Sequence, residues 1–245
     1  MILNAKLKRI LYSFKQFINQ IFKDAMLFMI CLAPVLYILF IRYAIPLAEE
    51  SLIEYIDLQK VISPYYLILD LLLVVLTPTM FSFSSAMVIL GEIDDGITKY
   101  MSVTPVGKEG YLISRIILSL VLSMLVTLIS LSFFSITKIK LSKIIILSLM
   151  SSVLGYIMCI LVISLSTNKV EGMAVMKLSG ILLMGIPIPF FTEGNVQYLA
   201  SLLPSLWLTK FAVEDNITYL ILYLLVSVIW ISVLTKKLKM KYNNN

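Results

Sequence analysis

Residues 65–90 read YYLILDLLLVVLTPTMFSFSSAMVIL and contain one charged residue, Asp70. A helix rises about 1.5 Å per residue, so an apolar run of this length can cross the hydrocarbon core of a bilayer, about 30 Å thick. The rest of the 245-residue chain has the same character, because 60% of its residues are hydrophobic and only 14% are charged. Soluble domains average about 25% charged residues. The sequence therefore predicts an all-α integral membrane protein.

Six apolar runs are long enough to span the bilayer. They cover residues 25–45, 65–90, 112–136, 144–166, 173–191 and 217–234. The run that begins at residue 25 is too long for a cleavable signal and lacks a small-residue cleavage site. We therefore expect six transmembrane helices, the first of which stays in the mature protein.

The positions of Lys and Arg predict the orientation. If the N-terminus is cytoplasmic, 14 of the 20 basic residues fall on the inner side and 6 on the outer side. Basic residues favour the cytoplasmic side, so both termini are expected to be cytoplasmic. The connection at residues 137–143, TKIKLSK, opposes this topology because it places three Lys outside. A single short basic loop on the outer side is tolerated when the other loops place more basic residues on the inner side.

Residues 1–24 form a predicted amphipathic helix. Apolar residues recur at steps of three and four at Leu3, Leu7, Ile10, Leu11, Phe14, Phe17, Ile18, Ile21 and Phe22, with Lys and Arg between them. Such a helix tends to lie flat at the level of the lipid headgroups. The alternative is a cytoplasmic helix that packs on a partner protein.

Several classes of site are excluded or disfavoured by composition. The chain has no His, and its two Cys, Cys31 and Cys159, lie inside apolar runs. A zinc cluster, a His metal site and a His general base are therefore excluded. The net charge of +6 agrees with cytoplasmic loops beside anionic lipid, so nucleic acid is not expected as a partner.

The connection after the second run concentrates charge of both signs. Residues 91–115 read GEIDDGITKYMSVTPVGKEGYLISR. Gly96 interrupts the helical period, and the Thr104–Pro105 step ends a short helix over about 97–103, since a residue before Pro avoids the helical region. An ordinary solvated loop with turn residues is the alternative.

Three segments carry a resemblance to a known family. They are the connection just quoted, with Glu92, Gly96, Thr104 and Pro105; residues 168–180, NKVEGMAVMKLSG; and residues 202–211, LLPSLWLTKF. Their order over the whole chain resembles the permease subunits of bacterial ATP-binding-cassette (ABC) type-two transporters, and in particular drug-export permeases of the fluoroquinolone type.

This resemblance implies a division of the chain and two inner contact regions. A six-helix transmembrane domain would cover residues 25–235, with an outer re-entrant segment at 192–216 before the last helix and a basic, polar cytoplasmic tail at 236–245. The loop at 91–111 would dock on an ATPase subunit, and the loop at 167–172 would form a second inner contact. The implied loop residues are Glu92, Asp94, Asp95, Gly96, Thr104 and Pro105 in the first, and Asn168, Lys169, Glu171 and Gly172 in the second.

The chain lacks the phosphate-binding loop of ATPases. The Gly107–Lys108 step is followed by Glu109 and has no Gly at the required earlier position. The resemblance therefore implies that ATP and Mg²⁺ bind a separate ATPase subunit and that this chain binds no cofactor. It also implies pairing with a second copy or a related permease in the bacterial cytoplasmic membrane. The expected function is ATP-driven export of a hydrophobic or amphipathic drug, antimicrobial peptide or lipid.

Four residues inside the runs are candidates for the translocation path or for hinges: Asp70, Pro78, Pro187 and Pro189. A charge at mid-membrane costs at least ~2.5 kcal/mol, so Asp70 faces the path, snorkels to the interface or pairs with Arg42. Each proline acts either as a hinge or as a static bend. Arg115 lies near an inner end, where its side chain is expected to snorkel to the interface.

Two alternative functions remain. One is a membrane-embedded enzyme that modifies lipids, for which Glu49–Glu50 is the only adjacent acidic pair in an outer loop. The other is an immunity protein that sequesters a membrane-active peptide without transport.

Overall fold

The computed structural model describes residues 2–56, 62–98, 100 and 107–243. The described part of the chain is helical and has no β-strand. Five helices in it are long and apolar enough to cross a membrane: Ala25–Ile53, Ser63–Asp94, Gly110–Phe134, Leu141–Leu165 and Ile217–Lys241. They coincide with five of the six predicted runs, which confirms the all-helical membrane fold.

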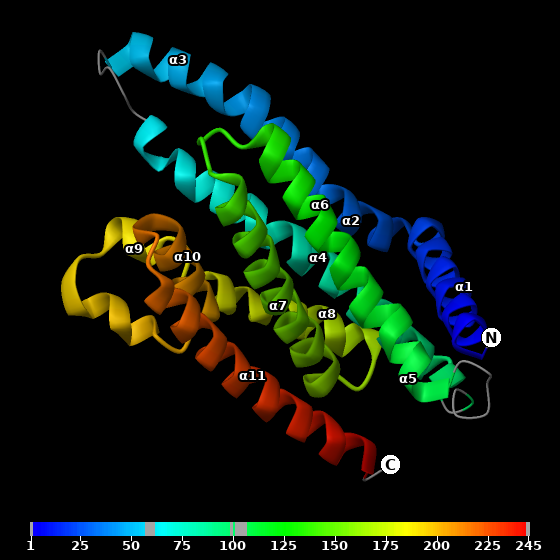
Figure 1. The fold of residues 1–245 in the computed structure, drawn as a ribbon. Helices are drawn as coiled ribbons and strands as arrows, with labels where there is room; N and C mark the ends of the chain where they lie inside the picture. Colours follow the sequence, from blue (N-terminus) through cyan, green and yellow to red (C-terminus); the bar gives the residue numbers. More distant parts are fainter. Residues whose placement is uncertain (1, 57–61, 99, 101–106, 244–245) are drawn as a thin grey trace.

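Two helices form the centre of the bundle, α4 (Tyr66–Asp94) and α7 (Leu141–Leu165). They pack against each other and, between them, against α2 (Ala25–Leu39), α6 (Leu118–Phe134), α8 (Lys169–Ser179) and α11 (Ile217–Asn243). In the most apolar window of each span, 61% of the residues are buried in the α4 span and 67% in α7, against 17% in the first and last spans. The first and last spans therefore lie at the edges (Figure 1).

A capping residue precedes the first membrane-spanning helix, and a π-helical turn interrupts this helix near its middle. Asp24 separates α1 (Ile2–Lys23) from α2, and its carboxylate accepts hydrogen bonds from the backbone N–H groups of Met26 and Leu27. A π-helical turn, Phe40–Ala44, then joins α2 to α3 (Ile45–Ile56). Glu49 of α3 accepts hydrogen bonds from the Ser63 N–H, at 3.0 Å, and the Tyr66 hydroxyl. These bonds attach α3 to the start of α4.

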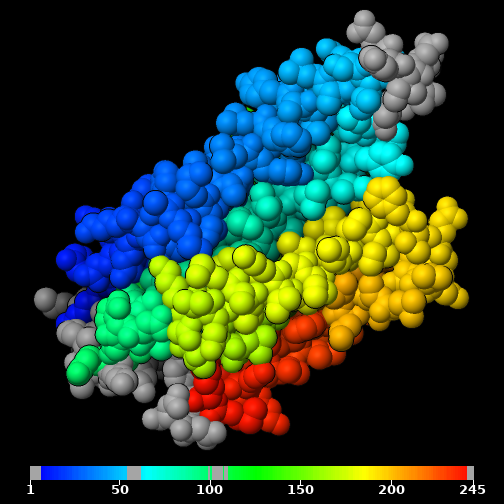
Figure 2. Space-filling model, turned by 180° about the vertical axis from the view of Figure 1, so that it is seen from behind, coloured from blue at the N-terminus to red at the C-terminus, as the bar shows by residue number. Residues whose placement is uncertain are grey.

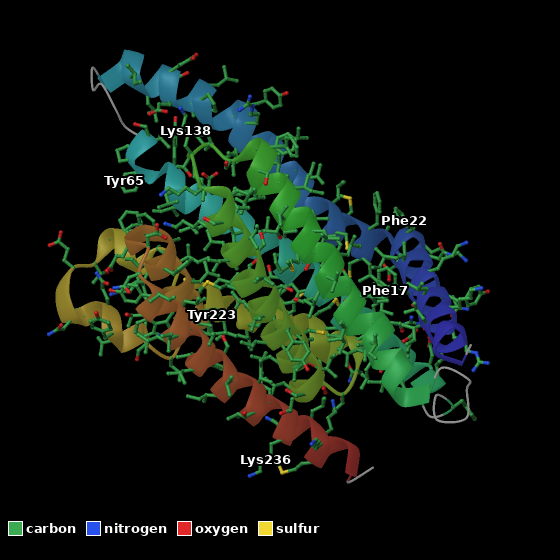
Figure 3. The ribbon with its side chains drawn as sticks, viewed as in Figure 1. Phe17, Phe22, Tyr65, Lys138, Tyr223 and Lys236 are labelled. Atoms are coloured by element: carbon green, nitrogen blue, oxygen red, sulfur yellow. The ribbon has the colours of Figure 1, made fainter. Side chains whose placement is uncertain are left out.

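Asp70 is fully buried and holds the turn between α6 and α7. Its carboxylate accepts hydrogen bonds from the backbone N–H of Ile136 at 3.0 Å and of Thr137 at 2.8 Å, and also from the Thr137 hydroxyl. Figure 3 shows Lys138, the next residue, at the same end of the bundle as Tyr65. The predicted pairing with Arg42 is therefore wrong, because both carboxylate oxygens of Asp70 are used by the backbone that leaves α6.

The predicted run at 173–191 is not one helix. It is divided into α8, a 3₁₀ turn (Gly180–Leu183), a turn at 184–187 and the short α9 (Ile188–Phe191). Pro187 and Pro189 lie at and just after the start of α9, where proline cannot continue an incoming helix. A Cβ at Gly185 would lie 2.4 Å from the backbone nitrogen of Leu206, so the bend brings two chain segments into direct backbone contact.

This interrupted segment still runs from one end of α4 to the other. At its beginning the Lys169 N–H donates to the Asp94 carboxylate at 2.9 Å. At its end the Phe191 ring stacks on Tyr65, with 5.5 Å between the ring centroids. Asp94 ends α4, and Tyr65 immediately precedes it. The segment therefore covers the length of the central helix although none of its helices is long enough alone.

The segment before the last helix turns back along that helix. A 3₁₀ helix (Gly194–Ala200) leads to α10 (Pro204–Glu214). The Leu202 carbonyl accepts a hydrogen bond from the Trp230 indole at 2.9 Å, about 20 Å along α11 from its start. Glu214, at the other end of α10, accepts from the Tyr219 hydroxyl at 2.6 Å near the start of α11. Consequently α10 lies antiparallel against the first half of α11.

The chain ends lie at the same end of the bundle (Figure 1). The Lys241 ammonium near the C-terminus donates to the carbonyls of Ile163, at 2.8 Å, and Ser166, where α7 ends. The same end holds α1, which contacts the last turn of α4. A cation at a helix C-terminus satisfies free carbonyls and the helix dipole, so this bond fixes the end of α11.

The contact between α4 and α7 depends on a glycine opposite a proline. Pro78 lies inside α4 and lacks the N–H that would bond the carbonyl one turn earlier. The hydroxyls of Thr77 and Thr79 donate to the carbonyls of Leu73 and Val75, which lie on either side of that unbonded carbonyl. The helix α4 continues past Pro78. A Cβ at Gly155 of α7 would lie 2.9 Å from the Pro78 carbonyl oxygen. Glycine therefore allows the two central helices to touch.

We predict that Gly155→Ala destabilises the protein by about 1–3 kcal/mol, because backbone must move to admit the methyl group. A loss of that size lowers Tm by several degrees, measurable by thermal unfolding in detergent. Gly180→Ala is the matched control, since nothing lies within 4 Å of a Cβ there. An unchanged Tm for Gly155→Ala would show that the helices do not rely on this contact.

Candidate functional site

Four segments that are far apart in the sequence meet where the termini lie. They are α1, the last turn of α4, the start of the third span (α5, Gly107–Leu112, and the π-helical turn Ile113–Ile117) and the first turn of α8. We call this group of segments the junction. It joins the flanks of both predicted inner loops, together with the N-terminal helix.

The centre of the junction is a buried ion pair. The Arg115 guanidinium donates two hydrogen bonds to the Glu92 carboxylate, Nη2 to Oε1 at 2.6 Å and Nε to Oε2 at 3.2 Å. Tyr111 donates to Glu92 at 2.6 Å and Gln20 donates at 3.1 Å. Glu92 is 4% exposed and Arg115 is 3% exposed. A buried pair of this kind is tolerated only when its geometry is good and its remaining polar atoms are satisfied.

Arg115 also attaches the N-terminal helix to the bundle. Its Nη1 donates to the Ser13 carbonyl at 2.7 Å and to the Ser13 hydroxyl at 3.3 Å. The Ser13 and Ser114 hydroxyls lie 3.0 Å apart. The guanidinium carbon lies 5.7 Å from the centre of the Phe17 ring and 5.4 Å from that of Tyr111. One cation therefore joins α1, α4 and the start of the third span.

The local backbone explains how Arg115 reaches these partners. Arg115 lies in the middle of the π-helical turn. Such a turn contains one more residue than an α-helical turn. Ser114, Arg115 and Ile116 are all buried there, toward α1 and α4. The predicted snorkelling of Arg115 is therefore wrong, because its side chain turns into the protein and not toward solvent.

A second ion pair joins α8 to the α1–α2 boundary. The Lys169 ammonium donates to the Asp24 carboxylate at 2.8 Å, while its backbone N–H donates to Asp94. The hydrogen bond from Lys169 lowers the pKa of Asp24 below its usual value. The contribution of this pair to stability is therefore present at neutral pH and is lost only as the pH falls through that lowered pKa. Both side chains are about one third exposed, so the pair contributes little on its own.

The first turn of α8 is capped by its own residues. The Asn168 side chain accepts from the Glu171 N–H at 2.9 Å, and the Glu171 carboxylate accepts from the N–H and the hydroxyl of Thr167. These hydrogen bonds lower the pKa of Glu171. A Cβ at Gly172 would lie 2.4 Å from Cδ1 of Leu90, so the glycine allows α8 to lie directly on α4. The predicted second inner loop is thus a rigid helix start.

The surface of the junction is hollowed between α1, α4 and α8. A hollow of about 410 Å³ is lined by Gln20, Lys23, Asp24, Leu27, Met87, Val88, Gly91, Glu92, Asp95 and Lys169. Figure 2 shows α8 in yellow-green on this face, between the blue N-terminal helices and the red C-terminal helix. The rim of the hollow carries both positive and negative side chains, which is typical of a polar contact surface and not of an apolar drug pocket.

The structure brings together most, but not all, of the predicted inner-loop residues. Glu92, Asp94, Asp95, Lys169 and Gly172 all belong to the junction or border it. Gly96 follows α4 with a φ of +71°, as expected of a glycine that ends a helix. Thr104 and Pro105 lie outside the described residues. Asp70, Pro78, Pro187 and Pro189 lie elsewhere in the fold, away from the junction.

Lys210 is a buried cation that sequence analysis counted only as an outer basic residue. It is 4% exposed, and its ammonium lies 4.3 Å from the centre of the Tyr198 ring and 5.4 Å from that of Tyr219. The spacing of aromatic residues around LLPSLWLTKF gives no signal for this arrangement, because Tyr198 and Tyr219 lie on separate helices.

The alternative enzymatic interpretation rests on the acidic pair Glu49–Glu50, which belongs to α3 in the described residues. Glu49, one of the adjacent acids, is engaged in joining α3 to α4. Within the same residues no three of His, Cys, Asp and Glu gather closely enough to hold a metal ion.

Comparisons with known proteins find one matching family and two relatives. A model of the family described as "Fluoroquinolones export permease protein Rv2686c-like" matches residues 17–236. Two relatives from Mycobacterium tuberculosis are each 25% identical to this chain over 191 residues, which is 77% of this chain and 75% of the relative. They are named Fluoroquinolones export permease protein MT2760 (strain CDC 1551 / Oshkosh) and Fluoroquinolones export permease protein Rv2686c (strain ATCC 25618 / H37Rv). No solved structure matches the chain. The family match covers most of the sequence, and the chain therefore belongs to the Rv2686c-like fluoroquinolone export permease family.

Proposed function

We propose that this chain is the membrane permease subunit of an ABC exporter that moves hydrophobic or amphipathic compounds out of the cell. The observation that carries the proposal is the junction, where three separate chain segments and α1 are joined at one end of a membrane bundle. The chain has no phosphate-binding loop, so ATP and Mg²⁺ bind a separate ATPase subunit. The relatives are named for fluoroquinolones, which we propose as one substrate class.

The junction forms the cytoplasmic side in this proposal. In the predicted topology 14 of the 20 basic residues fall on that side, in agreement with the positive-inside rule, and the end of α11 lies at the same end of the bundle as α1 (Figure 1). The segment at 169–191 is then a sixth, discontinuous crossing, supported by its contacts at both ends of α4. The turn of α10 against α11 makes residues 192–216 a re-entrant outer segment. Broken helices of this kind are tolerated where their backbone is buried in protein.

The exposed face of α1 supports an interfacial position. One face of α1, with Ile10, Phe17 and Ile21, is buried against the bundle. A second apolar stripe, which includes Leu7, Leu11 and Phe22, is exposed and follows the same helical period. Figure 3 shows Phe17 directed toward the bundle and Phe22 away from it. We propose that this second stripe lies among the lipid headgroups while the first anchors the helix.

The mechanism follows from the way in which the junction is connected. An ATPase that pushes on the loop at 91–111 displaces residues on either side of it, and these are held together by Glu92 and Arg115. Because Arg115 also binds Ser13, α1 moves with the ends of α4 and the third span as one body. Rigid helices then carry the displacement to the opposite end of the bundle, where pairing with a second permease copy completes the path.

The first test is to purify the tagged chain from its native membrane in mild detergent and to identify the co-purifying proteins. We expect a stoichiometric protein with a G-x-x-x-x-G-K-[ST] motif, and lower accumulation of a fluorescent fluoroquinolone in cells that express both chains. The ATPase inactivated at its motif lysine is the matched control and should abolish the difference. Recovery of the permease alone, even after crosslinking, would refute the ABC assignment.

The buried ion pair gives a second prediction. Arg115→Met alone should release α1 and abolish export, since an unpaired buried carboxylate costs about 3–5 kcal/mol. The double variant Glu92→Leu/Arg115→Met removes both buried charges of the junction and should recover most of the stability, but not the attachment of α1.

Docking of α1 can be measured with a disulfide. In a chain whose Cys31 and Cys159 are replaced by Ser, Ser13→Cys/Ser114→Cys should form a crosslink on mild oxidation, because the two hydroxyls lie 3.0 Å apart. Adding Arg115→Met should reduce the crosslink, whereas Arg115→Lys should preserve part of it. An equal crosslink yield in all three, with normal membrane insertion, would show that Arg115 does not hold α1.

A further inference from the structure

The outward face of α11 changes from apolar to basic along one stripe. Ile221, Leu225 and Val228 are 53%, 55% and 60% exposed. The same helical face continues with Ser232, then Lys236 and Lys239, all exposed. These positions follow one another at steps of three and four and so lie one above the other. Along the stripe, apolar side chains are followed by a hydroxyl group and then by two ammonium groups.

A shallow hollow lies at the basic end of this stripe. It has a volume of about 390 Å³ and is lined by Ser232, Thr235, Lys236, Lys239 and Met240. Figure 3 shows Lys236 directed away from the bundle. Thr235 donates its hydroxyl hydrogen to the Ile231 carbonyl, and its oxygen can still accept a hydrogen bond. Cationic donors and hydroxyls thus converge on one exposed site.

The depth of the hollow relative to the bundle follows from Lys241. The Lys241 ammonium binds the carbonyls of Ile163 and Ser166, where the apolar span of α7 ends. Lys239 and Lys236 precede Lys241 by about 3 Å and 7.5 Å along the helix axis. In a membrane, long lysine side chains extend toward the polar layer, which would bring both ammonium groups to the level of the lipid phosphates.

Neither lysine forms an ion pair with the described residues, and the acids Asp24, Glu92 and Asp215 pair with other cations. Lys241 is committed to α7, which holds the stripe in a fixed orientation. Two ammonium groups one helical turn apart, beside two hydroxyls and in line with an exposed apolar stripe, complement a single phosphate with attached acyl chains.

We propose that this stripe is a binding site for one anionic phospholipid. The phosphate lies between Lys236 and Lys239, the glycerol region contacts Ser232 and Thr235, and an acyl chain lies along Val228 and Leu225. The site is independent of the transport proposal, because it requires only that α11 spans the membrane with this face toward lipid.

The test compares lipid binding by the purified full-length chain in detergent, measured by native mass spectrometry with added phosphatidylglycerol. Lys236→Gln/Lys239→Gln should weaken binding roughly tenfold. The matched control is Lys15→Gln/Lys237→Gln, which removes two charges from the same end but leaves the hollow intact, and its affinity should be unchanged. An equal loss in both variants would show a diffuse charge effect and overturn the proposal.

Two further measurements use the unaltered chain. Phosphatidylcholine and glycerol phosphate should each bind at least tenfold more weakly than phosphatidylglycerol, since one lacks net charge and the other lacks acyl chains. Raising the salt concentration from 0.05 to 0.5 M should weaken binding of phosphatidylglycerol. Equal binding of glycerol phosphate would identify a simple anion site, and equal binding of phosphatidylcholine would identify a purely apolar groove. Either result would contradict the proposal.

Discussion

Every backbone amide inside a membrane needs a partner within the protein, and this requirement governs where the chain places its polar side chains. Asp70 supplies acceptors for two N–H groups that follow α6, and Lys241 supplies a donor for carbonyls at the end of α7. Asp24 and Asn168 do the same for the first turns of α2 and α8. The charged and amide side chains at these four positions thus complete the ends of helices.

This rule explains which parts of the fold were predictable. Apolar length and the positions of charge are properties of the sequence, so five spans were predicted correctly. The run at 173–191 has the same composition but contains Gly180, Gly185 and two prolines, whose effect depends on what packs beside them. Because Gly185 meets the backbone of Leu206, the break is stabilised by a segment about twenty residues away, which a window of local hydropathy cannot detect.

The candidate site was predictable to a similar degree. Glu92 and Arg115 are the charges that flank one short connection between antiparallel spans. The sequence therefore implied that the two residues lie at a similar depth in the membrane. Their contact with Ser13 was not, because it depends on how α1 folds back and on a π-helical turn that redirects Arg115. Asp70 was misassigned for the same reason: its partners are backbone groups 66 and 67 residues away, and amides carry no sequence signature.

The two ends of the bundle are therefore joined by different kinds of contact. At the junction, charged hydrogen bonds fix angles and distances, so segments that share Arg115 or Lys169 cannot slide independently. At the opposite end, charged hydrogen bonds of Glu49 and Asp70 are accompanied by stacked rings, such as Tyr65 with Phe191 and Trp207 with Tyr219, whose directional demands are weaker. A displacement applied at the junction would move the segments that share Arg115 or Lys169 together, whereas the stacked rings can change their packing at lower cost. In the proposed exporter this asymmetry places the stiff, ATP-driven part inside and the part that opens outside.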